Sequence, residues 1–214
     1  MSDIGGIAGF AADLMEWLGA PGAGLAVALE NLFPPIPSEV ILPLAGFTAS
    51  VGDMNLVAAI ICTTIGSVVG ALALYGIGQW FGRDRLYAVV ARMPLVKVTD
   101  VEKTEAWFAK HGTKAVFFGR FIPIFRSLIS IPAGLERMPL RLFLTLTALG
   151  SLIWNTLFIM LGYGLGSRWE TVSEVVGTYS KGVLVIALLA VAAFVVVRFV
   201  QLRRRRRAGL PEEP

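Results

Sequence analysis

The stretch FPPIPSEVILPLAG, at residues 33–46, recurs in altered form as FIPIFRSLISIPAG at residues 121–134. Aligned at an offset of 88 residues, the two share six of fourteen positions, including the closing Ala-Gly. The likeness continues downstream, where YGIG at 75–78 matches YGLG at 163–166 at the same offset and Gly-Ser at 66–67 matches Gly-Ser at 150–151. This self-similarity indicates an internal duplication.

Both copies lie in proline-rich surroundings. Residues 21–50 contain five prolines, and residues 115–139 contain three. Each proline removes a backbone donor and disfavours the helical conformation of the residue before it. A straight helix through either segment is therefore disfavoured, and we expect two broken, re-entrant hairpins at about residues 22–50 and 115–138.

The remaining composition is that of a membrane protein. The chain has 214 residues, is 56% hydrophobic and has a mean hydropathy of +0.72, with 16% charged residues against about 25% in soluble domains. Two uncharged stretches predict transmembrane spans at about 55–81 and 142–166, because a helix needs roughly 20 residues to cross the hydrocarbon. A third helix is expected at 181–202, where Lys181 and Arg198 can extend to the interface.

One broken hairpin followed by one span crosses the membrane once, so successive copies must point in opposite directions. The predicted fold is therefore an all-α membrane protein, an inverted repeat of a re-entrant hairpin plus a span over residues 21–180, with a further C-terminal helix. Inverted repeats whose broken helices meet near the midplane are typical of secondary transporters. Irregular backbone is tolerated at that depth only where protein or a water-filled cavity satisfies it.

The basic residues predict the orientation. No Lys or Arg precedes Arg83, whereas residues 83–114 hold seven and the tail at 203–214 begins with five consecutive arginines. The positive-inside rule places both regions, and hence the C-terminus, in the cytoplasm. This grouping explains the pI near 9.5 better than nucleic-acid binding does.

The N-terminal segment, residues 1–20, has an apolar and a polar helical face and is expected to lie at the interface. A first crossing within residues 4–32 is the alternative, and it would place the N-terminus inside. A second surface helix is expected near residues 101–111. Oligomerisation is left open by the sequence.

Four charges fall inside the broken segments: Glu30 and Glu39 in the first, Arg120 and Arg126 in the second. A charge at the bilayer centre costs roughly 2.5–3.5 kcal/mol, and opposed hairpins would bring acids and bases together. We interpret the arginines as ligands for a phosphate and the glutamates as groups that take up and release a proton. The alternative is a set of ion pairs that only fixes geometry.

Other candidates are secondary. Asn155 is a possible hydrogen-bonding residue between helices, and Asp53 is expected to cap a span at the outer interface. The many glycines of the spans are interpreted as packing positions. His111 is the only histidine and Cys62 the only cysteine, so neither a metal site nor a cofactor is expected.

Three elements resemble the DedA family, which belongs to the VTT-domain or SNARE-associated Golgi group: ENLFPPIPSE, GRFIPIFRSLISIPAG and the Gly150-x3-Trp154 spacing. The resemblance covers roughly residues 20–170. It implies a bacterial inner-membrane lipid transporter for undecaprenyl phosphate or a phospholipid, linked to the proton motive force and envelope integrity. The family's functional acids correspond to Glu30 and Glu39, and its arginines to Arg120 and Arg126. Many members have Pro-Gly-Asp where this chain has Pro-Ser-Glu at 37–39, which puts the substrate in doubt.

Three functions remain open at this point. The first is a flippase for a lipid phosphate, possibly coupled to protons. The second is a membrane phosphatase, which the single histidine and the missing nucleophile motif disfavour. The third is a scaffold or homeostasis factor whose intramembrane charges are structural.

Overall fold

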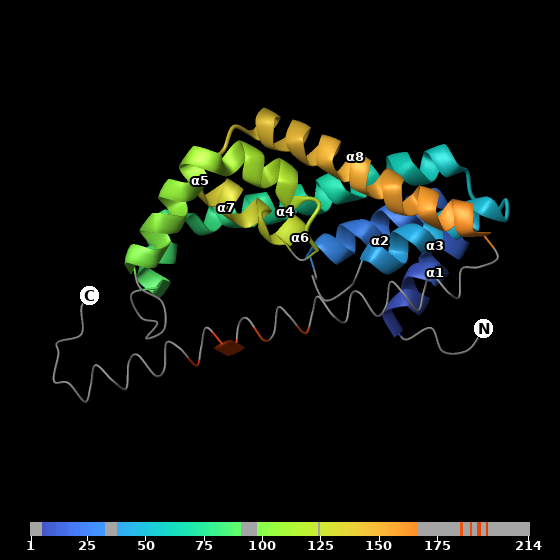
Figure 1. Cartoon of the computed structure of the whole chain (residues 1–214), viewed down its shortest axis with the longest axis horizontal. Helices are drawn as coiled ribbons and strands as arrows, with labels where there is room; N and C mark the ends of the chain where they lie inside the picture. The colour runs from blue at the N-terminus through green and yellow to red at the C-terminus, as the bar shows by residue number, and fades with distance from the viewer. Residues whose placement is uncertain are drawn as a thin grey trace.

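In the part of the chain that it describes, the computed structural model contains helices joined by turns and no strand, which confirms the predicted all-α class (Figure 1). It describes residues 6–32, 38–90, 98–123 and 125–166, with isolated positions between 185 and 196. The predicted C-terminal helix, apart from those positions, and the basic tail lie outside the described residues. The helices are α1 (Gly6–Leu18), α2 (Ala20–Leu32), α3 (Ser38–Ser50), α4 (Leu56–Val90), α5 (Val98–Gly119), α6 (Phe125–Leu128), α7 (Ser130–Leu135) and α8 (Leu140–Leu165).

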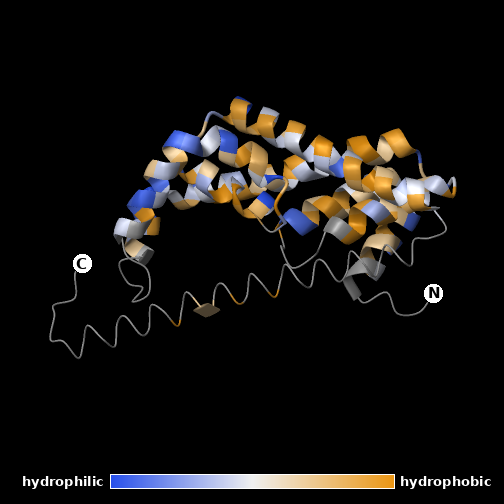
Figure 2. Ribbon diagram, viewed as in Figure 1, coloured by the Kyte–Doolittle hydropathy of each residue, from blue (hydrophilic) through white to orange (hydrophobic). Residues whose placement is uncertain are grey.

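Two of these helices, α4 and α8, are long and apolar enough to cross a membrane. They correspond to the two predicted spans, but α4 continues to Val90 past a kink at Gly82, whose φ is 68° and ψ 164°. Hydrophobic residues predominate along both helices (Figure 2). Many of their large apolar side chains are exposed, including Val57, Ile61, Ile65, Val69, Leu149, Ile153, Leu157 and Met160. So extensive an apolar surface suits contact with lipid.

The proline-rich segments are broken, but not at every proline. The first segment forms separate helices, with α2 ending at Leu32 and α3 beginning at Ser38, and Pro43 is accommodated inside α3. In the second, α5 ends at Gly119 and the short helices α6 and α7 follow. The helix α5 is continuous, so the residues of the predicted surface helix at 101–111 and those from 115 to Gly119 lie on one helix.

In each copy the first arm of the broken segment packs on the long helix of the same copy, and the second arm packs on the long helix of the other copy. The α2 helix packs on α4 of its own copy, and the end of α5 packs on α8 of its own copy. The second arms cross over: α3 packs on α8, and α7 packs on α4. Gly46 and Gly134, equivalent at the offset of 88, each occupy one of these crossings, against the backbone of Ile159 and of Tyr75 respectively.

The glycines at the crossings allow a testable comparison within α8. A methyl group added at Gly162 would overlap the carbonyl oxygen of Pro43, whereas one added at Gly164 has no neighbour within 4 Å. We expect Gly162→Ala to lower the free energy of unfolding by about 1–3 kcal/mol through overpacking. Gly164→Ala should be neutral or slightly stabilising. Thermal unfolding in detergent measures both, and equal effects would contradict this packing.

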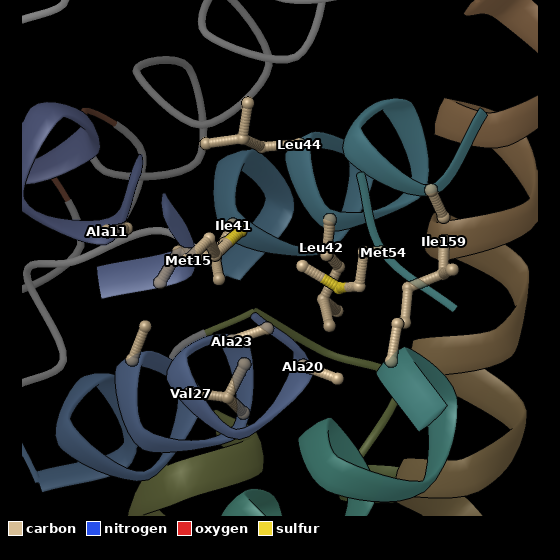
Figure 3. Close-up of a cluster of buried hydrophobic side chains, with 14 of the residues drawn as sticks. Ala11, Met15, Ala20, Ala23, Val27, Ile41, Leu42, Leu44, Met54 and Ile159 are labelled. Atoms are coloured by element: carbon tan, nitrogen blue, oxygen red, sulfur yellow. The ribbon is translucent and has the colours of Figure 1, made fainter. Parts of the chain in front are cut away.

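The two buried clusters divide between the ends of the fold. One gathers Ala11 and Met15 of α1 with residues of α2, α3, α4 and α8 (Figure 3). The other joins α4, α5, α7 and α8 around Tyr75 and Phe143, whose ring centroids are 4.8 Å apart. The α1 helix ends at Leu18 and is joined to α2 through Gly19 in the left-handed region (φ 62°), a backbone conformation that favours glycine.

An ion-pair cluster holds α4, α5 and the α7–α8 connection together. Arg83 donates to both carboxylate oxygens of Glu105, at 3.0 and 2.7 Å, and lies 3.3 Å from Glu136. The hydroxyl of Tyr87 also donates to Glu105, at 2.8 Å. Burial alone would raise the pKa of Glu105, but these hydrogen bonds outweigh it and leave the pKa of the carboxyl below its usual value.

A lowered pKa means that Glu105 stabilises the fold above its unfolded pKa of about 4.3, and that this contribution is lost as the pH falls through the lower folded value. We expect Glu105→Gln to cost about 0.5–1 kcal/mol at pH 7, because Arg83 is half exposed and solvent screens the pair. Unfolding measured across pH should show the difference shrink as the pH falls below the unfolded pKa of about 4.3 and vanish below the lower folded pKa. Glu102→Gln, an exposed change on the same helix, is the control, and a pH-independent cost at Glu105 would contradict the ion pair.

Candidate functional site

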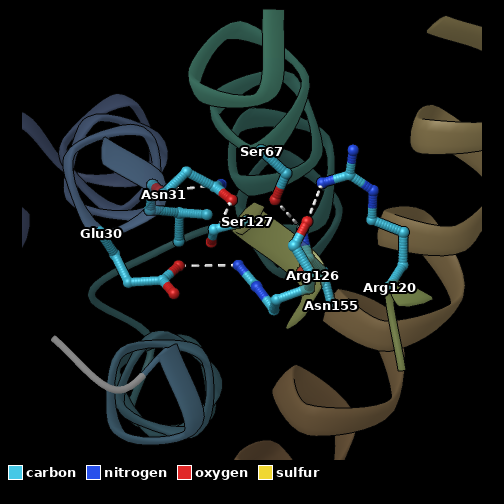
Figure 4. Close-up of polar contacts among 8 residues, drawn as sticks. Glu30, Asn31, Ser67, Arg120, Arg126, Ser127 and Asn155 are labelled. Atoms are coloured by element: carbon cyan, nitrogen blue, oxygen red, sulfur yellow. Dashed lines mark hydrogen bonds and ion pairs between the residues drawn. The ribbon is translucent and has the colours of Figure 1, made fainter. Parts of the chain in front are cut away.

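A buried ion pair joins the two broken segments. The carboxylate of Glu30, in the last turn of α2, accepts a hydrogen bond of 2.7 Å from Nη2 of Arg126 in α6 (Figure 4). The two residues are 4% exposed each and lie 96 positions apart in the chain. The structure therefore brings together an acid of the first segment and a base of the second, as their opposed arrangement predicted.

A neutral pair lies beside this ion pair. Asn31 accepts a hydrogen bond of 2.9 Å from the hydroxyl of Ser127, and its amide donates to the carbonyl of Val27 at 3.2 Å. Two consecutive residues of α2 thus bind two consecutive residues of α6. Sequence reasoning missed both Asn31 and Ser127, although each is a polar residue directly after a predicted site charge.

Arg120 is held differently. It is 2% exposed, and its guanidinium donates to the hydroxyls of Ser130 and Thr147, at 3.0 and 2.9 Å, and to the backbone carbonyl of Arg126. Its Nε has no hydrogen-bond partner. Its hydrogen-bond partners among the described residues are all neutral, so no carboxylate there contacts the guanidinium directly.

Asn155 forms another polar contact in the interior. Its amide donates to the hydroxyl of Ser67 in α4 at 3.2 Å, which links the two long helices (Figure 4). Its Oδ1 and the indole Nε1 of the neighbouring Trp154 are buried without a hydrogen-bond partner in the described structure. Ser67 was not predicted as a site residue, because a serine in an apolar helix carries no signal of its own.

The other predicted residues lie apart or are not described. Glu39 falls in the first turn of α3, and its side chain lies outside what the structure describes. Asp53 is exposed in the turn before α4 and does not join the buried charges. The expected capping role belongs to Asn55 instead, whose side-chain oxygen accepts from the backbone amide of Ala58 at 2.9 Å, as is usual for an N-cap.

The arrangement has a simple charge balance. Glu30 neutralises Arg126, while Arg120 keeps a buried positive charge surrounded by hydroxyl and carbonyl oxygens. A buried cation with spare donor capacity suits an anion that brings its own charge. Within the described residues no group of three or more His, Cys, Asp or Glu side chains is arranged to hold a metal ion.

An all-helical membrane protein whose two halves meet at buried charges is the class that this fold and site define. Residues 36–164 match the model of the VTT domain. The chain belongs to the VTT-domain, or DedA, family, as its motifs indicated. The predicted family is therefore confirmed.

Named relatives point in two directions. An "alkaline phosphatase-like protein" of Lactococcus lactis subsp. lactis is 44% identical over 194 residues, which cover 87% of this chain and 91% of the relative. "Undecaprenyl phosphate transporter A" of Bacillus subtilis is 37% identical over 187 residues, covering 87% and 93%. "Protein DedA" of Escherichia coli is 29% identical over 158 residues, covering 73% and 71%. No solved structure matches the chain significantly.

Proposed function

We propose that this protein transports a lipid phosphate across the bacterial cytoplasmic membrane, with undecaprenyl phosphate as the first candidate. The observation that carries the proposal is the uneven pairing of the two buried arginines. Arg126 is already paired with Glu30, whereas Arg120 contacts no carboxylate among the described side chains. A phosphate headgroup would supply the missing negative charge through forked hydrogen bonds.

The fold supports a route for such a substrate. In this proposal α2 with α3, and the end of α5 with α6 and α7, are re-entrant hairpins, and residues 21–180 form the transport domain. The C-terminus of the chain lies in the cytoplasm. The headgroup moves between the hairpins while the lipid tail stays in the bilayer. Residues 1–20 rest at the interface in this arrangement.

The Glu30–Arg126 pair then acts as the gate between the hairpins. Protonation of Glu30 removes its attraction for Arg126, frees the guanidinium for the phosphate and allows the hairpins to separate. Glu39, in the first turn of α3, is the second proposed proton carrier. Transport in this scheme is coupled to protons, and no metal or cofactor takes part.

The experiment uses the purified full chain in vesicles that contain labelled undecaprenyl phosphate in both leaflets. A soluble phosphatase added outside hydrolyses only the outer pool, so a transporter lets hydrolysis proceed to completion. We expect full hydrolysis with the wild-type protein and about half with Arg126→Gln, which removes the guanidinium that takes the phosphate. Glu30→Gln, the neutral equivalent of protonated Glu30, should still reach full hydrolysis but lose its dependence on pH. Glu16→Gln, an exposed acid on α1, is the charge-matched control. Half hydrolysis with the wild-type protein would refute transport of this lipid.

A membrane phosphatase is the second candidate, because two relatives are named "alkaline phosphatase-like protein". The same vesicles test it without the soluble enzyme. Release of inorganic phosphate by the chain alone would favour catalysis, and no release is expected.

A scaffold role is the third candidate. If the Glu30 and Arg126 variants lose folded yield in proportion to their loss of transport activity, that role is favoured instead.

A further inference from the structure

The outward face of α5 carries a regular pattern of basic and aromatic residues that the proposed transport site does not use. At about 100° per residue its members fall within an arc of about 100° on one side of the helix. They are Lys103, Trp107, Lys110, His111, Lys114 and Phe118. The three lysines are exposed, and Trp107 and Phe118 are 54% and 60% exposed.

The opposite side of α5 is the one that docks on the protein. Phe108 is 5% exposed within the cluster around Tyr75, and Glu105 pairs with Arg83. Glu105 is also the only acid between Lys103 and Phe118. From Lys103 to Phe118, after the exposed Glu102, the helix therefore separates its charges, with its acid turned inward and its bases outward.

The exposed residues on this face change in character along the helix, from tryptophan and lysine to purely apolar side chains. Trp107 stacks on His111 with ring centroids 5.2 Å apart, and the ring nitrogen Nδ1 of His111 lies 3.1 Å from the carbonyl of Trp107. Further along, the exposed residues become apolar at Phe118 and Ile122, where the chain enters the second broken segment. Tryptophan and lysine at the polar end and phenylalanine at the apolar end match the layering of a membrane interface.

The location of α5 fits that layering. It lies at one end of the long apolar helices, where hydrophilic residues gather (Figure 2). We infer that this face of α5 binds the anionic headgroups of the bilayer that α4 and α8 cross. The surface would hold α5 at the interface next to the second hairpin, independently of which substrate the buried charges take.

Hydrogen exchange of the full chain in lipid nanodiscs tests this inference. One preparation contains phosphatidylcholine alone, and the other contains about a quarter phosphatidylglycerol. We expect amides of residues 98–119 to exchange at least about tenfold more slowly with the anionic lipid, since each lysine near an anionic surface changes binding about fivefold. High salt should remove the difference by screening.

Matched variants identify the surface. Exchanging Lys103, Lys110 and Lys114 together for glutamine should abolish the lipid dependence. Exchanging Arg203, Arg204 and Arg205 for glutamine changes the net charge equally and should preserve it. Equal exchange of the wild-type protein in both lipids, or a lysine variant that keeps the dependence, would overturn the inference. Arg126→Gln should lose transport but keep the protection, so the two proposals fail separately.

Discussion

Glu30→Gln is expected to lower the free energy of unfolding by about 3–5 kcal/mol, because it leaves the guanidinium of Arg126 buried without its counter-charge. Arg126→Gln should cost a similar amount, since the carboxylate of Glu30 is 4% exposed. Thermal unfolding in detergent gives both values. Glu16→Gln and Arg141→Gln, exposed charges on α1 and α8, should each change stability by less than about 0.5 kcal/mol.

The double exchange Glu30→Arg with Arg126→Glu separates stability from function. If the pair only fixes geometry, the swapped pair should restore both stability and transport. In the proposed mechanism it restores part of the stability and no transport, because the acid then lies on the segment that must hold the phosphate. Transport by the swapped protein at the wild-type rate would refute the gating role.

Arg120→Lys is expected to weaken the apparent affinity for lipid phosphate by about tenfold to a hundredfold, which corresponds to losing one charge-assisted hydrogen bond. Lysine keeps the charge but cannot reproduce the planar fork that reaches Ser130, Thr147 and the carbonyl of Arg126. Initial rates measured against the mole fraction of undecaprenyl phosphate give the affinity. The maximal rate should fall less than the affinity.

Two variants show whether Arg120 acts on substrate or only on the fold. Ser130→Ala and Thr147→Val remove neutral partners of Arg120 while leaving its charge in place. They should lower the unfolding temperature and leave the affinity for lipid phosphate within about threefold. If Ser130→Ala and Thr147→Val weaken the affinity as much as Arg120→Lys does, then Arg120 only stabilises the fold and the phosphate site lies elsewhere.

The repeat and the charges could be predicted because each has a strong local signal. The offset of 88 residues, the prolines and the isolated charges are visible in one dimension, and they led to the contact between Glu30 and Arg126. The neutral partners could not be predicted, because Asn31, Ser127, Ser67 and Thr147 resemble ordinary helix residues. Their roles depend on which helices face one another, across 96 positions for Asn31 and Ser127, 88 for Ser67 and 27 for Thr147, and only the packed structure fixes that.

The glycines of the long helices are a second case in which the sequence predicts a role but not the residues that fill it. Their general role in close packing was predicted, and Gly66, Gly78, Gly150 and Gly162 do lie at crossings. Gly76 and Gly164 have the same sequence context but no neighbour within 4 Å. Spacing alone cannot separate the two groups, because the face that meets another helix depends on the exchange of partners between the copies.

That exchange of partners has an evolutionary consequence. A half-length ancestor with one hairpin and one long helix could form this core only as a homodimer, in which each subunit lends its second arm to the other. Its two subunits would have inserted into the membrane in opposite directions, so the ancestral gene product needed dual topology. Under the proposed inverted topology, fusion of two such genes would fix one orientation for each half and would let one copy keep the acids and the other the bases.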